Sequence, residues 1–83
     1  MDESQKDGMR AIAALHSIVD GRDPVADRAM IMFTLDHVVS ATLLLVMEGD
    51  HEKAAGMLNE GLVLGVERRI AIHQNRMRRR AND

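Results

Sequence analysis

The sequence predicts an all-α protein with three helices per chain: a long antiparallel helical hairpin with a shorter N-terminal helix, forming a helical bundle on dimerisation. Aromatic residues make up only 1 % of the 83 residues, whereas β-strands favour aromatic and β-branched side chains. Apolar residues recur at three- and four-residue steps, which is helical spacing. The two longest apolar segments are separated by only Gly49 and Asp50, and such short connections make helices antiparallel neighbours. A chain of this length forms a single helical domain, residues 1–83.

The first helix is expected over residues 4–20. Ile12, Leu15, Ile18 and Val19 follow one another at helical spacing. Gly21 comes directly after this segment, where a left-handed residue closes a helix at little cost.

The second helix is expected over residues 24–48. Asp23 is a capping residue, and Pro24 fits the first helical position, where its missing N–H is not needed. Gly49 ends the segment. Apolar residues lie on nearly every side of this helix, a pattern typical of a helix that is buried all round or spans a membrane.

The third helix is expected over residues 50–78, with Asp50 as its cap and residues 79–83 as a basic, frayed tail. A break at Gly61, or a short strand over residues 62–66, is the alternative to one continuous helix. One apolar stripe is expected along the helix, formed by Ala55, Leu58, Leu62, Val66, Ile70, His73 and Met77.

The turn between the second and third helices resembles the helix–turn–helix junction of a tetratricopeptide repeat. The resemblance rests on residues 49–54, with Leu58 and Gly61 following. The pattern does not recur at a 34-residue period, and a single repeat cannot bury its own core. It therefore implies an antiparallel turn and no function.

A homodimer is expected because the chain is too small to cover the second helix by itself. Domains of this size have a marginal core, and without cysteine there are no disulfides to stabilise it. A two-fold pair of hairpins would bury self-complementary patches. The expected interface residues are Met30, Phe33, His37, Ala41, Leu44, Leu58, Leu62, Gly61 and Gly65.

The C-terminal part of the chain is strongly basic. Between residues 61 and 83, six arginines stand against Glu67 and Asp83, a net charge of +4. This basic patch could contact nucleic acid or an acidic protein partner, or it could be a solvated helix end favoured by the helix dipole. The patch consists of Arg68, Arg69, Arg76, Arg78, Arg79 and Arg80.

Asp36 and His37 are the remaining candidates for chemistry, because they lie midway along the most apolar segment. They could form a small-molecule or metal-dependent site at the dimer core. An ion pair of Asp36 with Arg68 or Arg69 is expected instead. The four histidines include no pair at metal-binding spacing, and neither a nucleophile motif nor a phosphate-binding loop is present. No catalytic residue, cofactor or metal is therefore expected.

The expected function is that of a small, non-catalytic helical interaction or regulatory module that forms a homo-oligomer. The arginine-rich composition suggests a bacterial origin. The acidic N-terminus lacks the features of a secretory signal, and an ionised Asp36 at the centre of a membrane span costs about 2.5–3.5 kcal/mol. A cytoplasmic location without membrane insertion is expected.

Overall fold

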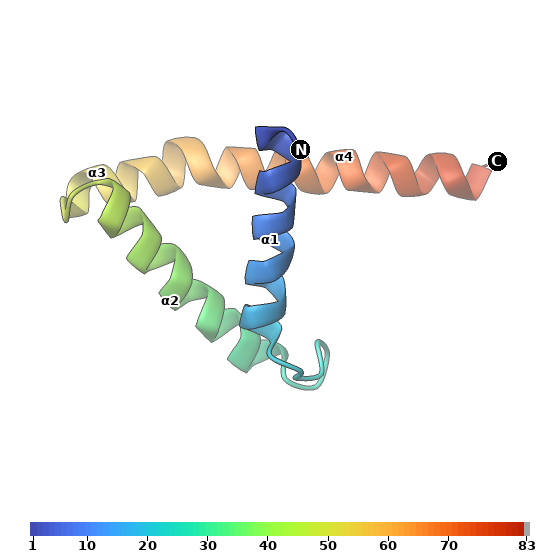
Figure 1. Ribbon diagram of the computed structural model, residues 1–83, viewed down its shortest axis with the longest axis horizontal. Coiled ribbons are helices and arrows are strands. Elements are labelled where there is room, and N and C mark those ends of the chain that lie inside the picture. The colour runs from blue at the N-terminus through green and yellow to red at the C-terminus, as the bar shows by residue number, and fades with distance from the viewer. Residues whose placement is uncertain (83) are drawn as a thin grey trace. The chain divides into compact units, whose positions relative to one another are not determined.

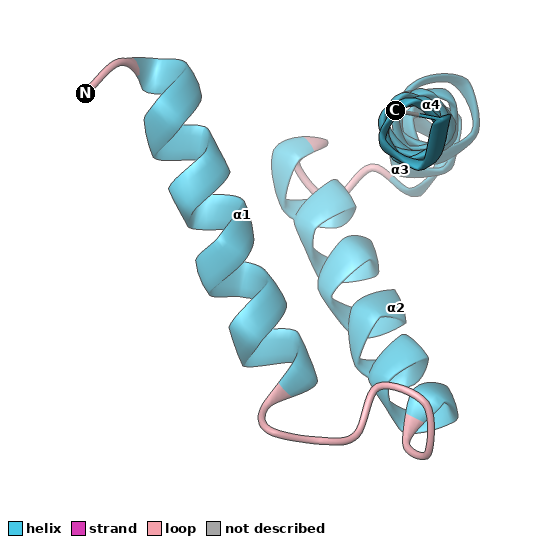
Figure 2. Ribbon diagram, turned by 90° about the vertical axis from the view of Figure 1, so that its right-hand side faces the viewer, coloured by secondary structure: helices cyan, strands magenta, loops and turns pink. Residues whose placement is uncertain are grey.

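The protein is all-α in the computed structural model, which describes residues 1–82, and these residues include no strand (Figures 1 and 2). The helices are α1 (Glu3–Val19), α2 (Arg28–Val46), α3 (His51–Met57), η1 (Leu58–Leu62) and α4 (Val63–Asn82). The last three follow one another without a break, so the expected all-α fold with three helical segments is confirmed. The chain divides into two compact units, Met1–Val39 and Ser40–Asp83. The antiparallel hairpin and the dimeric bundle stay predictions.

In the first unit, side-chain and backbone caps define both ends of α1. The Asp2 carboxylate accepts a hydrogen bond from the Gln5 N–H, and the Gln5 side chain accepts one from the Asp2 N–H. This capping box satisfies two donors that have no partner within the helix. At the other end Asp20 and Gly21 both adopt positive φ, 50° and 71°, as the position of Gly21 indicates.

The helix α2 begins at Arg28, four residues after the expected start at Pro24. Asp23 does act as a cap: its Oδ1 accepts hydrogen bonds from the N–H groups of Val25 and Ala26, both at 2.8 Å. The turn that Asp23 caps is separate from α2. The Asp27 carboxylate closes this turn by accepting a hydrogen bond from the Asp23 N–H at 3.1 Å. Side chains thus satisfy the donors of this turn, and the regular helix starts only beyond it.

In the second unit, Glu48 and Gly49 end α2 in left-handed conformations, with φ of 54° and 79°. The Gly49 N–H donates to the Leu44 carbonyl at 2.7 Å and the Glu48 N–H to the Leu45 carbonyl at 3.3 Å. This pairing is a Schellman motif. Asp50 then caps α3 as expected, with its Oδ1 accepting from the Lys53 N–H at 3.0 Å.

The third helical segment is continuous through Gly61, but it contains one π-helical turn, η1. The Val63 N–H donates to the Leu58 carbonyl, five residues back, and the Asn59 amide donates to the Ala55 carbonyl at 2.9 Å. The segment continues as α4 to Asn82, so residues 79–82 are helical, where a frayed tail was expected. Asp83 lies outside the described residues.

The π-helical turn alters the expected apolar stripe. An i→i+5 turn holds about one residue more than an α-helical turn, so the residues that follow are rotated by about 100°. Ala55 before η1 and Val66 and Ile70 after it therefore lie on different faces. The expected single stripe is wrong, because it assumed a uniform α-helix.

Candidate interaction surface

The main candidate site is the surface of α2, whose apolar side chains lie on all sides and are exposed. No residue of α2 is buried. Large apolar residues around the helix remain well exposed, among them Met30 at 59 %, Met32 at 50 % and Leu45 at 79 %. Among residues 1–80 only Ala54 of α3 is buried. An apolar surface of this extent is typical of a binding interface.

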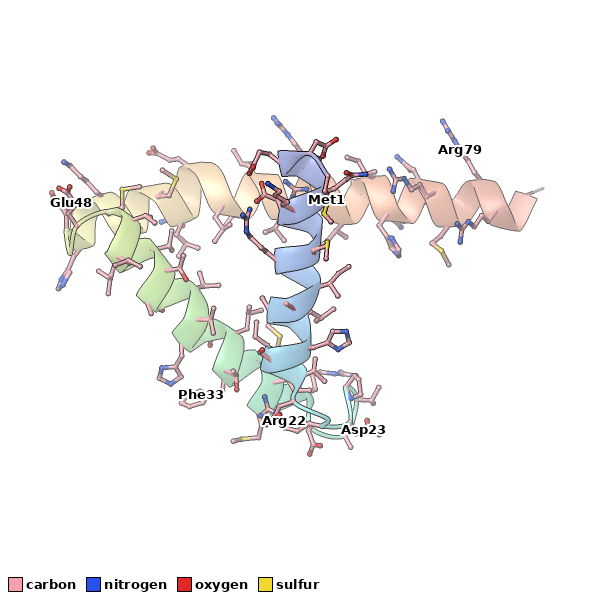
Figure 3. The ribbon with its side chains drawn as sticks, in the orientation of Figure 1. Met1, Arg22, Asp23, Phe33, Glu48 and Arg79 are labelled. Carbon is pink, nitrogen blue, oxygen red and sulfur yellow. The ribbon has the colours of Figure 1, made fainter. Side chains whose placement is uncertain are left out.

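Five of the expected interface residues share one face of α2. At 100° per residue they fall within an arc of about 80° centred on His37. All five are exposed, and Phe33 projects from the helix in Figure 3. We call this surface the His37 face; its residues are Met30, Phe33, His37, Ala41 and Leu44.

The chain's own packing uses the opposite side of α2. Ile31, Leu35, Val39 and Leu43 are half-buried. At 100° per residue they lie about 120–160° from His37. The chain's own packing covers part of that side, where Met32 and Val46 stay exposed, and it also reaches Leu44 at one end of the His37 face, which lines a hollow with Ala54 and Leu58.

The phenyl ring of Phe33 and the imidazole ring of His37 meet edge to face, with their centroids 4.6 Å apart and their planes at 86°. This geometry is favoured for aromatic pairs. Because the two residues are four positions apart on one helix, the contact orients both side chains on the His37 face. It gives the face a fixed, slightly polar centre.

Four other expected interface residues lie along the third helical segment. Leu58, Gly61 and Leu62 belong to η1, with Leu58 and Leu62 exposed at 36 % and 37 %, and Gly65 is half-buried in α4. A Cβ at Gly61 would lie 3.0 Å from the Met57 sulfur. The chain's own methionine thus occupies the space beside Gly61.

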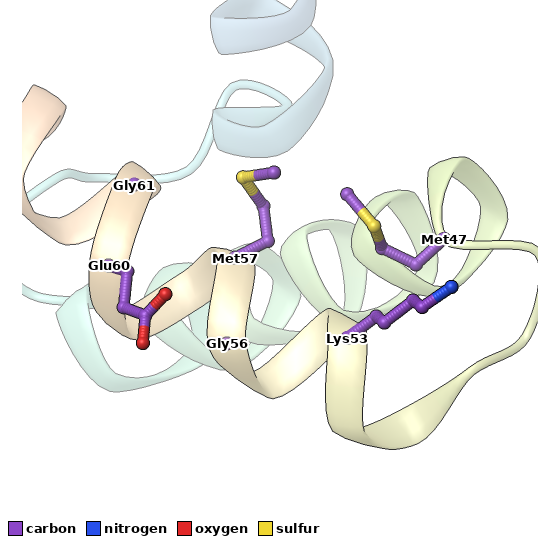
Figure 4. Close-up of a pocket in the computed structure, with 6 residues that line it drawn as sticks. All are labelled: Met47, Lys53, Gly56, Met57, Glu60 and Gly61. Carbon is purple, nitrogen blue, oxygen red and sulfur yellow. The ribbon is translucent and has the colours of Figure 1, made fainter.

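A hollow of about 440 Å³ opens beside η1 (Figure 4). The thioether side chains of Met47 and Met57 and the backbones of Gly56 and Gly61 line it, together with Lys53 and Glu60. Methionine thioethers adapt readily to the shape of a partner side chain. This hollow and the exposed leucines of η1 form a second apolar area in the Ser40–Asp83 unit.

The six arginines of the expected basic patch all lie on α4 and are exposed; Arg79 stands away from the helix in Figure 3. At 100° per residue, all of them except Arg78 fall within an arc of about 120°. Val66, Ile70 and Met77 occupy the neighbouring arc. The helix α4 is therefore basic on one face and apolar on the next.

Asp36 and His37 are both exposed on α2 in the single chain, and the expected site around them at the dimer core stays a prediction. Among the described residues, no group of three histidine or acidic residues could hold a metal ion. The ion pairs of the described chain join Glu3 to Lys6 and Arg10, and Asp7 to Arg10, all on α1. The expected pairing of Asp36 with Arg68 or Arg69 joins residues of different units and stays a prediction.

One structural residue, Arg22, was not identified from the sequence. Its guanidinium donates to the Ile18 carbonyl, to the Val19 carbonyl at 3.1 Å and to the Thr34 hydroxyl at 3.1 Å. It therefore caps the last turn of α1 and ties it to α2. The available signal was a lone arginine directly after a helix-ending glycine, where a cation is favoured by the helix dipole.

By length and composition alone, α2 could also cross a membrane: it has 19 residues, and none of the segment tested is buried. Its 1.5 Å rise per residue gives a length of about 28 Å, close to the thickness of a bilayer core. Asp36 and His37 lie at its centre.

Comparison of the chain with protein-family models, curated proteins and solved structures finds no significant match.

Proposed function

We propose that this protein is a non-catalytic helical interaction module that completes its core by pairing with a second copy of itself. The observation that carries the proposal is the exposure of apolar side chains all round α2. Burying this apolar surface would stabilise the protein by about 25 cal/mol per Å², and the helix lacks this stabilisation while its side chains stay exposed. A partner helix bundle restores it.

The area required is larger than one face of α2. A stable interface buries about 800 Å² on each partner, and half the lateral surface of a helix 28 Å long and 10 Å wide is about 450 Å². The exposed leucines of η1 and the neighbouring hollow offer additional apolar area in the Ser40–Asp83 unit. The proposed dimer therefore uses the third helical segment as well as α2.

Sedimentation equilibrium at micromolar concentration tests this proposal. The expected mass is twice the 9.2 kDa of the chain. The variant Leu44→Asp places a charge on the His37 face and should give a monomer or an unfolded chain, while Gln74→Asp on α4 serves as a charge control. A species of one chain mass at all concentrations would contradict the proposal.

We propose that α2 pairs with protein and does not insert into a membrane. An ionised aspartate at the centre of a membrane span costs about 2.5–3.5 kcal/mol, and Asp36 occupies that position. Flotation with phospholipid vesicles should leave the protein in the unbound fraction. Recovery with the vesicles after an alkaline wash would show insertion and refute this part of the proposal.

A second function, binding to nucleic acid, is favoured by the arginines that α4 gathers on one face. Each neutralised phosphate contributes about −0.9 to the slope of log affinity against log salt concentration. Replacing Arg76, Arg79 and Arg80 by glutamine should abolish binding to a DNA duplex, whereas Arg78→Gln, which lies off the arc, should change it far less. Absence of binding in low salt would exclude this function.

A further inference from the structure

The residues of the His37 face are arranged symmetrically along the sequence. Phe33 and Ala41 lie four residues on either side of His37, and Met30 and Leu44 lie seven residues on either side. His37 is also the central residue of α2, Arg28–Val46. A helix face whose apolar positions lie at equal steps on either side of its midpoint can pair with itself about a two-fold axis.

We infer that two copies pair through α2 in antiparallel orientation, with the two-fold axis at His37. This inference rests on the proposed dimer and specifies its geometry. The axis places Phe33 of each copy opposite Ala41 of the other, and Met30 opposite Leu44. The two His37 side chains meet at the centre.

Side-chain size favours this orientation over a parallel one. Facing positions that alternate large and small residues interdigitate without voids, and the antiparallel pair sets the exposed ring of Phe33 against the methyl group of Ala41. A parallel pair in the same register sets Phe33 against Phe33 and Ala41 against Ala41, which crowds one layer and leaves a gap in another.

The helix dipoles favour the same orientation. The antiparallel pair brings the N-terminal end of each α2 beside the C-terminal end of the other. Helix dipoles of opposite direction attract each other. Asp36 lies about 100° from His37 on the helix, so it stays at the margin of the contact. His37 is the one titratable residue among the five of the His37 face.

Cysteine cross-linking tests the geometry cleanly because the chain contains no cysteine. A disulfide needs Cα atoms within about 7 Å. In the inferred dimer the two copies of residue 37 meet at the axis. The two copies of residue 41 lie about 12 Å apart along the helices, since eight residues separate their levels at 1.5 Å each.

Under mild oxidation, His37→Cys should therefore form a covalent dimer, and Ala41→Cys alone should not. Phe33→Cys mixed with Ala41→Cys should give a covalent heterodimer, which tests the geometry independently of His37. Val46→Cys, on the opposite side of α2, serves as the control for random collision. Sedimentation of each variant under reducing conditions establishes whether it still dimerises.

The possible results separate the inference from the proposed dimer. Rapid self-linking of Ala41→Cys in a protein of two-chain mass would show a parallel pair and overturn the inferred geometry alone. The inferred geometry would also be overturned if the protein dimerises but His37→Cys links no faster than Val46→Cys, and the mixture of Phe33→Cys and Ala41→Cys does not either. Another face would then form the contact. A single-chain mass for the unmodified protein would overturn both proposals.

Discussion

Phe33 offers the most sensitive test of the His37 face, because its ring is 58 % exposed and its edge-to-face contact is with His37 on the same helix. Replacing it by alanine therefore removes a large part of the proposed interface with little expected change in the packing of the isolated chain. The side chain of Met32, exposed at 50 %, points about 140° away from the centre of the His37 face. Met32→Ala is thus the matched control.

The expected loss of affinity follows from the exposed area of the ring. An aromatic side chain presents about 200 Å². With 58 % of Phe33 exposed, the dimer can bury about 115 Å² more in each copy, worth about 3 kcal/mol. Alanine keeps part of this contact, so we expect a loss of about 2 kcal/mol per copy and about 4 kcal/mol per dimer, an increase of about 10³-fold in Kd.

Analytical ultracentrifugation over a concentration series measures the Kd of dimerisation directly, and far-UV circular dichroism shows whether the helices are retained. Phe33→Ala should raise the Kd by about three orders of magnitude, while Met32→Ala should change it by less than tenfold. An unchanged Kd for Phe33→Ala, or an equal effect of Met32→Ala, would refute the assignment of the His37 face.

Three further predictions, tested with four substitutions, concern other parts of the structure. Gly49→Ala should lower the free energy of unfolding in urea by about 1–2 kcal/mol, because an L-residue is strained at the φ of 79°, even though the space around Gly49 is open. Gly8→Ala, also in open space but within α1, should raise that free energy by about 0.5–1 kcal/mol. Equal effects of the two substitutions would contradict this conformational explanation. Hydrogen bonds from the Ala26 and Val25 N–H groups lower the pKa of Asp23. Its carboxylate therefore contributes stability above the ordinary aspartate pKa, and this contribution is lost as the pH falls through the lowered pKa. The difference in Tm between the unmodified protein and Asp23→Ala should shrink on acidification from pH 6 to pH 2, and a constant difference would contradict the stabilising role of the carboxylate. His37→Leu should lower the Kd of dimerisation but allow more than one orientation, because a lone polar residue in an apolar contact specifies register at a cost in stability. A higher Kd for this variant would contradict this expectation and indicate that the two imidazoles contribute favourably.

The helices and their caps could be predicted from the sequence because they depend on local chemistry. Asp50 caps a helix and Gly21 adopts a left-handed conformation, since both effects involve only a few neighbouring residues. The expected start of α2 at Pro24 was four residues early, because the Asp27 carboxylate accepts a hydrogen bond from the Asp23 N–H and closes a separate turn there. The capping role of Asp23 could be predicted from the sequence, whereas its hydrogen bond to the Asp27 carboxylate depends on the path of the turn.

The π-helical turn and the role of Arg22 could not be predicted in the same way. A π-helical turn differs from an α-helical turn by one inserted residue, and apolar periodicity alone does not distinguish an interrupted stripe from a continuous one. The three hydrogen bonds of Arg22 depend on the path of the α1–α2 connection. The five residues of the His37 face, by contrast, share one side of a regular helix, so their spacing was sufficient to group them.

The central claim is that a second copy of the chain covers the His37 face of α2. Sedimentation equilibrium of the unmodified protein in aqueous buffer without detergent tests it most directly. The claim predicts a single species of twice 9.2 kDa at micromolar concentration that dissociates on dilution. A folded, helical species of one chain mass over the whole concentration range would contradict it.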